Sequence, residues 1–415
     1  MGDEAREGEE EEVGEARSAL VSKTAPLLED AASKAGLVLL CGAIAVKCVR
    51  SMVARFNRLQ LRGTSKGKGD LLEAKDILLG GSAFAGMFQP ISEEEVFLVL
   101  KEALDCGVCH IDTAPHYGLG LSEERIGSCL RKIRMMPNSL TRKAEKVKVY
   151  TKVGRLIRGR GEVGKTIDES EVQWDNVAGS EGCIFKGIPE DRVAVLDYSA
   201  EGARTSFKES EERIDGHVYG LRVHDCETEE ILARATATGK AAGALAGLGK
   251  LKREGKVGSI GIGVNDPEFA LRALKSSCGY LIDTVMIAGS WNLLDQSAHD
   301  LLLYCQRHGV EVHNAGVFAS GLIMGGNTVR YAPAQRAMVD KARRWRVLCQ
   351  NHGTSIAAVA LAFAFLPKCV KKVAIGVKSV AELKESLGSL GSHVPKELWL
   401  DAKREGLVSK HLFFH

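Results

Sequence analysis

The sequence has no large excess of charge of either sign and no long hydrophobic run. Its 56 basic and 53 acidic residues leave a formal net charge of +3 over 415 residues. Because basic and acidic residues are nearly equal in number, there is no electrostatic reason to expect a nucleic acid as a partner. The uncharged apolar stretch at residues 35–46 is shorter than the about twenty residues that a membrane-spanning helix needs.

The start of the chain also lacks the marks of export or lipidation. An acidic block from Asp3 to Glu15 stands where a secretory signal or an Arg-rich transit peptide carries basic residues. Gly2 is not followed by the Ser or Thr at position six that myristoylation prefers. The eleven cysteines, scattered from Cys41 to Cys369, favour free thiols in a reducing compartment. We therefore expect a cytoplasmic protein.

One pair of cysteines has the spacing of a covalent haem site, but the two cysteines lie in different predicted elements. Residues 106–110 read Cys-Gly-Val-Cys-His, which matches the short haem-attachment pattern. The first cysteine ends a predicted amphipathic helix, residues 92–106, whereas the second lies in a β-like run. Because the two thiols belong to different elements of a packed core, we assign no haem, no redox dithiol and no metal.

The composition changes near residue 70 and divides the chain in two. Residues 1–70 form a predicted N-terminal extension with an acidic start and a basic tract at 47–68, both expected to be solvated or disordered. We interpret this extension as a helical or flexible segment without a membrane contact. The alternative is a helix over residues 31–61 that lies on a membrane surface and faces anionic lipid. Residues 71–415 are predicted to form the folded domain.

Short apolar runs alternate with helical patterns from about Leu71 onward, which predicts βα units and a parallel sheet. Eight such units favour the α/β class and a closed (β/α)8 TIM barrel. A doubly wound open sheet is the alternative. The predicted strands are Ile77–Leu79, Val108–Asp112, Val147–Thr151, Val218–Val223, Ser259–Val264, Thr284–Ala288, Val310–His313 and Lys372–Ile375.

One connection, at about residues 153–198, is much longer than the others. It is rich in glycine and charged residues and leaves the same end of the barrel as the chemistry described next. Long ordered loops in compact domains are usually functional or disordered. We interpret it as either a loop that covers the substrate or a plain insertion.

Polar residues with complementary chemistry end three predicted neighbouring strands. Asp112 ends VCHID, Lys152 ends VKVYTK and His224 ends VYGLRVH, while Tyr117 follows Asp112 in the loop DTAPHYG. Catalytic groups of (β/α)8 barrels come from the carboxyl ends of different strands. The four side chains are therefore predicted to converge at one mouth.

These residue types suit reduction of a carbonyl or oxidation of an alcohol. Tyr117 is a poor acid or base at neutral pH unless a cation stabilises its phenolate, and Lys152 supplies that charge. Asp112 holds Lys152 protonated and oriented, and His224 hydrogen-bonds the substrate oxygen. The hydride itself must come from a nicotinamide, because no side chain can donate one.

Each of the four residues also has a structural interpretation when it is taken alone. Asp112 can cap the following turn, Lys152 can be a solvated strand-end residue, and His224 a hydrogen-bonded interior histidine. Tyr117 can be an exposed loop aromatic. Their joint placement favours catalysis. Two further histidines, His110 and His116, flank the same strand end and are candidates for either substrate contact or packing.

The cofactor motif of Rossmann folds is missing. The first strand ends in Gly80-Gly81-Ser82, without the third glycine or the acidic partner that a dinucleotide fold requires. A better candidate follows the last strand, in Ile375-Gly376-Val377-Lys378-Ser379. Gly376 allows a close turn, and Lys378, Ser379 and the N-terminus of the next helix suit a phosphate.

At these residues the chain resembles the aldo-keto reductase family, in particular its sugar dehydrogenases acting on L-galactose and L-fucose (D-threo-aldoses), with pyridoxal dehydrogenases nearby. The resemblance spans roughly residues 77–390. The segments that carry it are HIDTAPHYGLGLSEERIG (110–127), TKVGRL (151–156), LDYSAEGARTSFKES (196–210), LRVHD (221–225), LKREGKVGSIGIGVN (251–265), WNLLDQS (291–297) and AIGVKSVAELKES (374–386).

The resemblance implies a barrel that binds NADP or NAD across its carboxyl-terminal face, with a catalytic tetrad of Asp112, Tyr117, Lys152 and His224. It also implies contacts of the cofactor with six further residues. Three positions depart from the family pattern: Ser386 replaces an adenine-contacting Asn, residues 315–318 lack the usual aromatic of strand seven, and Ser290-Trp291 replaces an Arg-Tyr pair. The implied cofactor contacts are Asn265, Gly376, Lys378, Ser379, Glu382 and Glu385.

Two functions follow from these observations. The first is an NAD(P)-dependent oxidoreductase, an aldose 1-dehydrogenase or a reductase of small aldehydes, whose partner is a small-molecule carbonyl or sugar. The alternative is a regulatory subunit on the same fold that binds the cofactor and reports redox state to a partner, which the unusual N-terminal segment motivates. The complete tetrad favours the enzyme.

Overall fold

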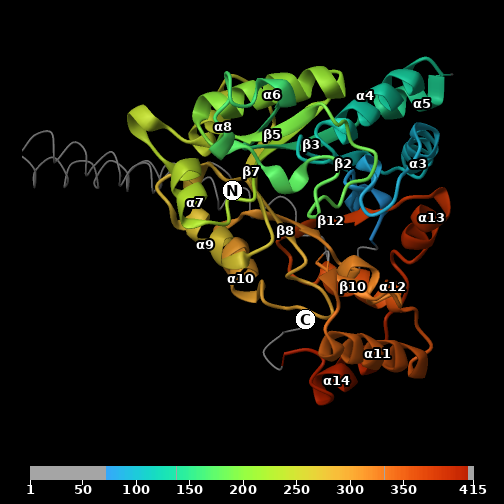
Figure 1. The fold of residues 1–415 in the computed structure, drawn as a ribbon. Coiled ribbons are helices and arrows are strands. Elements are labelled where there is room, and N and C mark those ends of the chain that lie inside the picture. Colours follow the sequence, from blue (N-terminus) through green and yellow to red (C-terminus); the bar gives the residue numbers. More distant parts are fainter. Residues whose placement is uncertain (1–71, 137, 331, 410–415) are drawn as a thin grey trace, which may run out of the picture. The chain divides into compact units, whose positions relative to one another are not determined.

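Eight parallel strands close into a barrel in the computed structural model of the chain, which describes residues 72–136, 138–330 and 332–409. Their order is β1-β12-β9-β8-β7-β6-β3-β2, and helices surround the barrel (Figure 1). The predicted (β/α)8 TIM barrel is confirmed, and the open sheet was wrong. The predicted extension at residues 1–70, with its stretch 31–61, lies outside the described residues.

The observed barrel strands begin and end within two residues of the predicted ones. Such differences are expected, because strand ends are the least defined part of a sequence pattern. The strands are β1 (Ile77–Gly80), β2 (His110–Asp112), β3 (Lys148–Val153), β6 (Val218–His224), β7 (Ser259–Val264), β8 (Thr284–Ala288), β9 (Glu311–Ala315) and β12 (Val370–Gly376).

The helices begin where the sequence supplies caps. Ser92 accepts a hydrogen bond from the backbone N–H of Glu95, and the Glu95 carboxylate accepts one from Ser92, which forms a capping box at the first long helix. The α-helices are α3 (Glu93–Asp105), α4 (Leu121–Arg134), α5 (Asn138–Ala144), α6 (Ala200–Ile214), α7 (Glu229–Thr236), α8 (Ala244–Arg253), α9 (Pro267–Lys275), α10 (His299–His308), α11 (Arg336–Asn351), α12 (Ile356–Ala364), α13 (Val380–Gly388) and α14 (Lys396–Arg404).

Within the described part of the chain, no single helix is long and apolar enough to cross a membrane. The pair α11 and α12 meets the length and composition of a span only when taken together, and the two helices are bent by 108° at their junction. A small two-stranded sheet, β10 (Thr328–Val329) and β11 (Ala332–Pro333), precedes α11.

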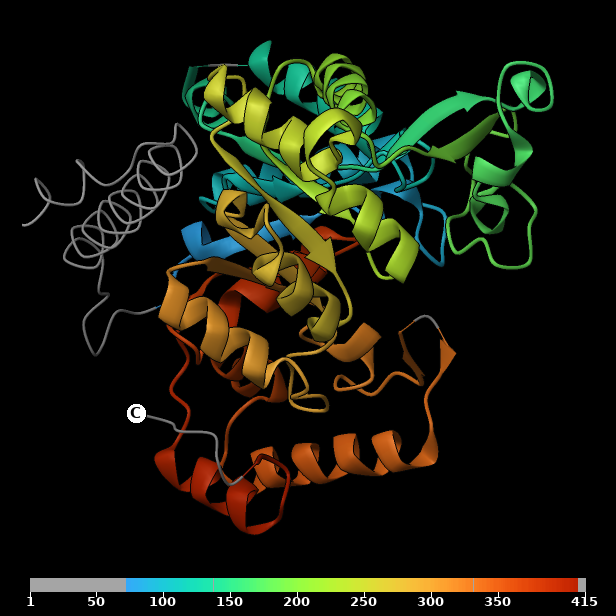
Figure 2. The ribbon, with the colours of Figure 1, turned by 90° about the vertical axis from the view of Figure 1, so that its left-hand side faces the viewer.

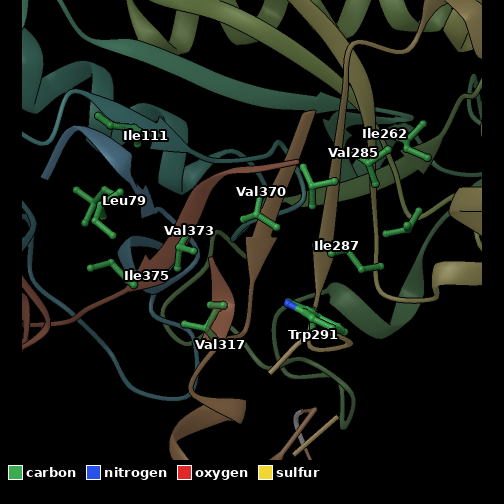
Figure 3. Close-up of a cluster of buried hydrophobic side chains, with 14 of the residues drawn as sticks. Leu79, Ile111, Ile262, Val285, Ile287, Trp291, Val317, Val370, Val373 and Ile375 are labelled. Carbon is green, nitrogen blue, oxygen red and sulfur yellow. The ribbon is translucent and has the colours of Figure 1, made fainter. Parts of the chain in front are cut away.

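The main core lies between the barrel and its helices. Alternate strand residues such as Leu79, Ile111 and Val285 belong to this large cluster (Figure 3). Residues of the other parity point into the barrel, where Leu78 and Tyr150 belong to a separate small apolar cluster. Asp112, Lys152 and His224 also point into the barrel. Each is separated by an even number of positions from another inward-pointing residue of its own strand.

The long connection after β3 forms an antiparallel hairpin beside the barrel. Its strands are β4 (Arg155–Gly159) and β5 (Arg192–Leu196), which pair from Arg155↔Leu196 to Gly159↔Arg192. Figure 2 shows this hairpin and its loops in green, projecting from the barrel. The loop between the strands returns to the barrel, where the backbone N–H of Phe88 donates to the carbonyl of Ile184 at 2.7 Å.

Candidate active site

A cavity of about 640 Å³ lies at the carboxyl ends of the barrel strands. Its size falls in the range of small-molecule sites, which is about 300–1,000 Å³. The four predicted catalytic residues all line this cavity: Asp112, Tyr117, Lys152 and His224. They come from the neighbouring strands β2, β3 and β6 and from the loop after β2, so the structure brings the sequence-predicted groups together.

Lys152 is the centre of the contacts in this cavity. Its Nζ donates to Asp112 Oδ2 at 2.7 Å, to the carbonyl of Thr113 at 2.9 Å and to the Tyr117 hydroxyl oxygen at 3.0 Å. An ammonium has three N–H bonds, and these three acceptors use all of them. The Tyr117 oxygen is therefore an acceptor from Lys152, and its own proton is left for a different acceptor.

The loop that carries Tyr117 is held close to the barrel by its backbone. Gly118 has a φ of +65°, and a Cβ there would lie 2.8 Å from the Cβ of Ala85, so only glycine fits this turn. Ser122, the second residue of α4, donates to the carbonyl of Gly81 at 2.8 Å. These contacts fix the height of the Tyr117 ring above the barrel.

Burial raises the pKa of Tyr117 well above its ordinary value, and the carboxylates of Asp112 and Asp225 raise it further. The guanidinium groups of Arg222 and Arg155 act in the opposite direction and lower it. Burial also lowers the pKa of Lys152, against which the Asp112 carboxylate favours the charged ammonium. The cationic side chains of the site therefore surround the Tyr117 phenol, where they favour its ionised form.

His224 and His116 lie beside Tyr117 as neutral imidazoles. The ring centroid of His224 is 5.8 Å from that of Tyr117 and 5.6 Å from that of His116. Burial lowers the pKa of both histidines well below the ordinary value, and the Arg155 guanidinium lowers it further. A neutral imidazole offers one N–H donor and one acceptor, which suits a hydrogen bond to a carbonyl or alcohol oxygen.

His110, the other histidine near the strand end, is not part of the cavity lining. Its ring lies 6.3 Å from that of Tyr150, toward the opposite end of the strand from Asp112. Burial lowers the pKa of His110 to about 4. Of the two flanking histidines, only His116 reaches the cavity.

Comparison with known proteins identifies the family of the chain. The sequence pattern of the aldo/keto reductase family matches residues 76–399. This chain belongs to the aldo/keto reductase family. It is 30% identical to D-threo-aldose 1-dehydrogenase of Pseudomonas sp over 337 residues, covering 79% of this chain and 93% of the relative. It is 28% identical to pyridoxal 4-dehydrogenase of Microbacterium luteolum over 349 residues, covering 80% and 94%.

Solved aldo-keto reductases share the fold. The glycerol dehydrogenase of Gluconobacter oxydans superposes with a TM-score of 0.56 at 18% identity, covering 79% of this chain and 90% of the other. The holo form of an aldo-keto reductase from Bacillus halodurans gives 0.57 at 19% identity, covering 81% and 93%. Family and relatives together support an oxidoreductase that acts on a small molecule.

The predicted cofactor residues of this aldo/keto reductase fall into two groups. Ser379 is the N-cap of α13 and accepts from the backbone N–H of Glu382; it is not part of the cavity lining. The other predicted residues do line the cavity: Asn265, Gly376, Lys378, Glu382 and Glu385. They stretch along the wall from β7, past the end of β12, to α13.

The cavity has the features that an extended dinucleotide needs. No heavy atom lies within 4 Å of an ideal Cβ on Gly376, so the backbone there leaves room for a close ligand. The loop after β9 contributes Phe318 and Ser320 to the lining, with Ser320 in the left-handed region at φ +55°. Lys378 and the carboxylates of Glu382 and Glu385 along one wall fit the phosphates and ribose of a nicotinamide cofactor.

Sequence reasoning missed two parts of the site. Phe318, the last of the residues 315–318 that were expected to lack the usual aromatic, places its ring in the cavity lining. Arg222, two residues before His224 on β6, donates to Asp112 Oδ1 at 2.6 Å. The two-residue period of a strand was a usable signal, because it places Arg222 on the same inward face as His224.

The inserted segment supplies an apolar wall to the same cavity. Ile184 and Phe185 line it together with Met87 and Phe88 from the loop after β1. Met87 and Phe185 form an antiparallel bridge, and the Phe185 ring lies 6.0 Å from that of Tyr117. This wall therefore faces the atoms at which the chemistry is expected.

Proposed function

We propose that the chain is an NAD(P)-dependent oxidoreductase that moves a hydride between a nicotinamide and the carbonyl or alcohol carbon of an aldose or small aldehyde. The observation that carries this proposal is the donation from Lys152 Nζ to the Tyr117 hydroxyl oxygen at 3.0 Å, with Asp112 on the other side of Lys152. This arrangement gives Tyr117 the environment of a general acid/base.

In the direction of reduction, the residues act on the substrate oxygen. A nicotinamide held in the cavity would supply the hydride for the carbonyl carbon. Tyr117 donates its hydroxyl proton to the oxygen, and the phenolate that remains accepts from Lys152. His224 donates a hydrogen bond to the same oxygen and orients the carbonyl. Oxidation of an alcohol runs the same steps in reverse, with the phenolate as base.

Support for the substrate class comes from the relatives and from the cavity. The relatives include proteins named for D-threo-aldose and pyridoxal, which are both carbonyl compounds or their cyclic forms. The cavity combines the polar end at Tyr117 with the apolar wall of Met87 and Phe185. The choice between NADP and NAD rests on Lys378 and Glu382, which carry opposite charges at the same end.

The deciding experiment follows nicotinamide absorbance in both directions with a panel of aldoses, aromatic aldehydes and small aldehydes. Tyr117→Phe removes the proton donor, and we expect its kcat to fall by about 10²-fold or more. Tyr280→Phe is the matched control, because Tyr280 is 84% exposed and lies outside the cavity lining. Unchanged turnover in Tyr117→Phe would contradict the mechanism.

Cofactor binding is measured separately by quenching of tryptophan fluorescence. Tyr117→Phe should bind the cofactor as tightly as the wild type, since the loss concerns proton transfer. Tight binding by the wild type without turnover of any substrate in the panel would instead favour the regulatory subunit. Loss of a bound partner on deletion of residues 1–70 would then support that alternative.

A further inference from the structure

Arg222 is a fully buried cation directly below the proposed acid/base site. Its side chain has 0% exposure, and its NH1 donates to Asp112 Oδ1 at 2.6 Å while Lys152 uses Asp112 Oδ2. One carboxylate therefore serves two cations, one on each oxygen. Burying a charge is costly, so a second cation on the same carboxylate calls for a physical explanation.

The remaining contacts of Arg222 hold it in place without neutralising it. Its NH2 donates to His313 Nδ1 on β9, and because a guanidinium has no acceptor, this nitrogen of His313 is unprotonated. Burial and the Arg222 charge lower the pKa of His313 well below its ordinary value. The Arg222 Cζ lies 4.6 Å from the ring centroid of Tyr150. Both neighbours are neutral.

The charges around Tyr117 do not cancel. Asp112 pairs with Lys152, and Asp225 pairs with Arg155 at 3.0 Å, so these two pairs cancel. Arg222 is the remaining charge, which leaves the described cluster with a net charge of +1. The titratable and charged groups facing Tyr117 or Arg222 are Asp112, His116, Tyr150, Lys152, Arg155, His224, Asp225 and His313.

We propose that Arg222 is a positioning residue for proton transfer, whose permanent charge makes the cluster net positive and thereby stabilises the phenolate of Tyr117. The proposal rests on the proposed function, because it assigns Arg222 a role through Tyr117. Arginine suits this role better than lysine, since its guanidinium stays charged when buried beside another cation. The Arg222 guanidinium acts against burial and lowers the pKa of Tyr117.

Three substitutions separate the charge of Arg222 from its hydrogen bond to Asp112. Arg222→Lys keeps a cation, Arg222→Gln keeps an N–H donor without charge, and Arg222→Met removes both. The measurement is kcat/KM against pH, for carbonyl reduction and alcohol oxidation. In the wild type, reduction falls and oxidation levels off as Tyr117 loses its proton.

We expect both midpoints to move to higher pH by about one unit or more in Arg222→Gln and Arg222→Met. At neutral pH, where Tyr117 is protonated in every variant, this shift lowers the phenolate fraction, and with it kcat/KM for oxidation, by about tenfold. Arg222→Lys should stay nearer the wild type than either. If Arg222→Gln matches the wild type, or if no variant shifts the midpoints, the charge has no role in proton transfer and the proposal is overturned.

A second readout needs no turnover. Ultraviolet difference absorbance of tyrosinate is followed with pH for wild type and Arg222→Gln, each against the same protein carrying Tyr117→Phe. The Tyr117 signal should develop at lower pH in the wild type, and equal curves would contradict the proposal.

If Arg222→Met does not fold, Arg222→Gln and Arg222→Lys still decide. Turnover in Tyr117→Phe would overturn the proposed function itself, whereas an inactive Tyr117→Phe with unshifted Arg222 profiles overturns only this inference.

Discussion

The Nζ of Lys152 lies 2.7 Å from Oδ2 of Asp112, and both side chains are at most 5% exposed. A buried pair of this kind is maintained by its geometry, because either charge alone would be strongly disfavoured in the interior. The third N–H bond of Lys152 is directed to the hydroxyl oxygen of Tyr117. The pair therefore links the barrel interior to the cavity.

Replacement of Lys152 by Met should remove the stabilisation of the Tyr117 phenolate. We expect kcat/KM to fall by about 10²-fold or more in both directions, while the dissociation constant of the cofactor changes little. Steady-state kinetics and fluorescence titration measure the two quantities. Lys165→Met, at an exposed position of the inserted segment, is the control and should match the wild type. Equal activities of the two variants would contradict the assigned role of Lys152.

His224 should stay neutral across the physiological range of pH. Burial and nearby cations lower its pKa well below the ordinary value, so its protonation occurs only in more acidic solution. We expect kcat/KM for carbonyl reduction to show no decline centred near pH 6.5, the pH at which an ordinary histidine titrates. An acidic decline that disappears in His224→Gln but persists in the exposed control His308→Gln would show that the imidazole titrates there.

The placement of this tetrad was accessible from the sequence, because strand ends and strand parity both leave a local signal. Asp112 and His224 end β2 and β6 as predicted, and Lys152 lies one residue before the end of β3. The shared orientation of these residues follows from the two-residue period of each strand. Neighbouring strands in a barrel then bring them within contact distance.

Other parts of the site depend on contacts that no local pattern encodes. Phe88 and Ile184 are far apart in the sequence, and only the folded loop brings the backbone of one to that of the other. Ser379 was predicted to meet a phosphate, yet it caps α13 with its side chain, because a Ser at this position serves either purpose equally well in sequence. The partner of Arg222 across the barrel, His313, comes from a strand that is not adjacent to β6.

The apolar wall should select for substrates with an apolar or aromatic group. Phe88 lines the cavity at 38% exposure, and its truncation removes apolar contact area from a bound aromatic aldehyde. Phe88→Ala is expected to raise KM for benzaldehyde by about tenfold, since a lost aromatic contact costs about 1–2 kcal/mol. The KM for glyceraldehyde should change little.

Trp174→Ala provides the matched control for this wall. Trp174 belongs to the inserted segment that also carries Phe185 and has the same 38% exposure as Phe88, but it does not line the cavity. Its variant should leave both KM values unchanged. If Phe88→Ala raises KM for both aldehydes equally, the wall does not discriminate between them.

Lys378 and Glu382 should act in opposite directions on the choice of cofactor. The Glu382 carboxylate accepts from the backbone N–H of Lys378 at 2.8 Å, so it lies at the helix N-terminus where a 2′-phosphate would otherwise be favoured. Glu382→Gln should lower the dissociation constant for NADP relative to NAD, and Lys378→Gln should raise it. We expect about tenfold for each.

Fluorescence titration of both cofactors measures these constants, and Lys368→Gln is the control, because Lys368 is exposed and lies outside the cavity lining. A parallel change for NADP and NAD in either variant would show that the residue does not read the 2′ position.

The contact between α4 and α6 should be intolerant of added volume. An ideal Cβ on Gly127 of α4 would lie 2.1 Å from the carbonyl oxygen of Arg213 on α6, so Gly127→Ala forces the two helix backbones apart. Overpacking of this kind costs about 1–3 kcal/mol, which we expect as a decrease in the free energy of unfolding by urea denaturation. Gly388→Ala, at the end of α13 with no heavy atom within 4 Å of its Cβ, should be neutral or slightly stabilising, because alanine favours a helix. Equal stabilities of the two variants would mean that α4 and α6 have room to separate at no cost.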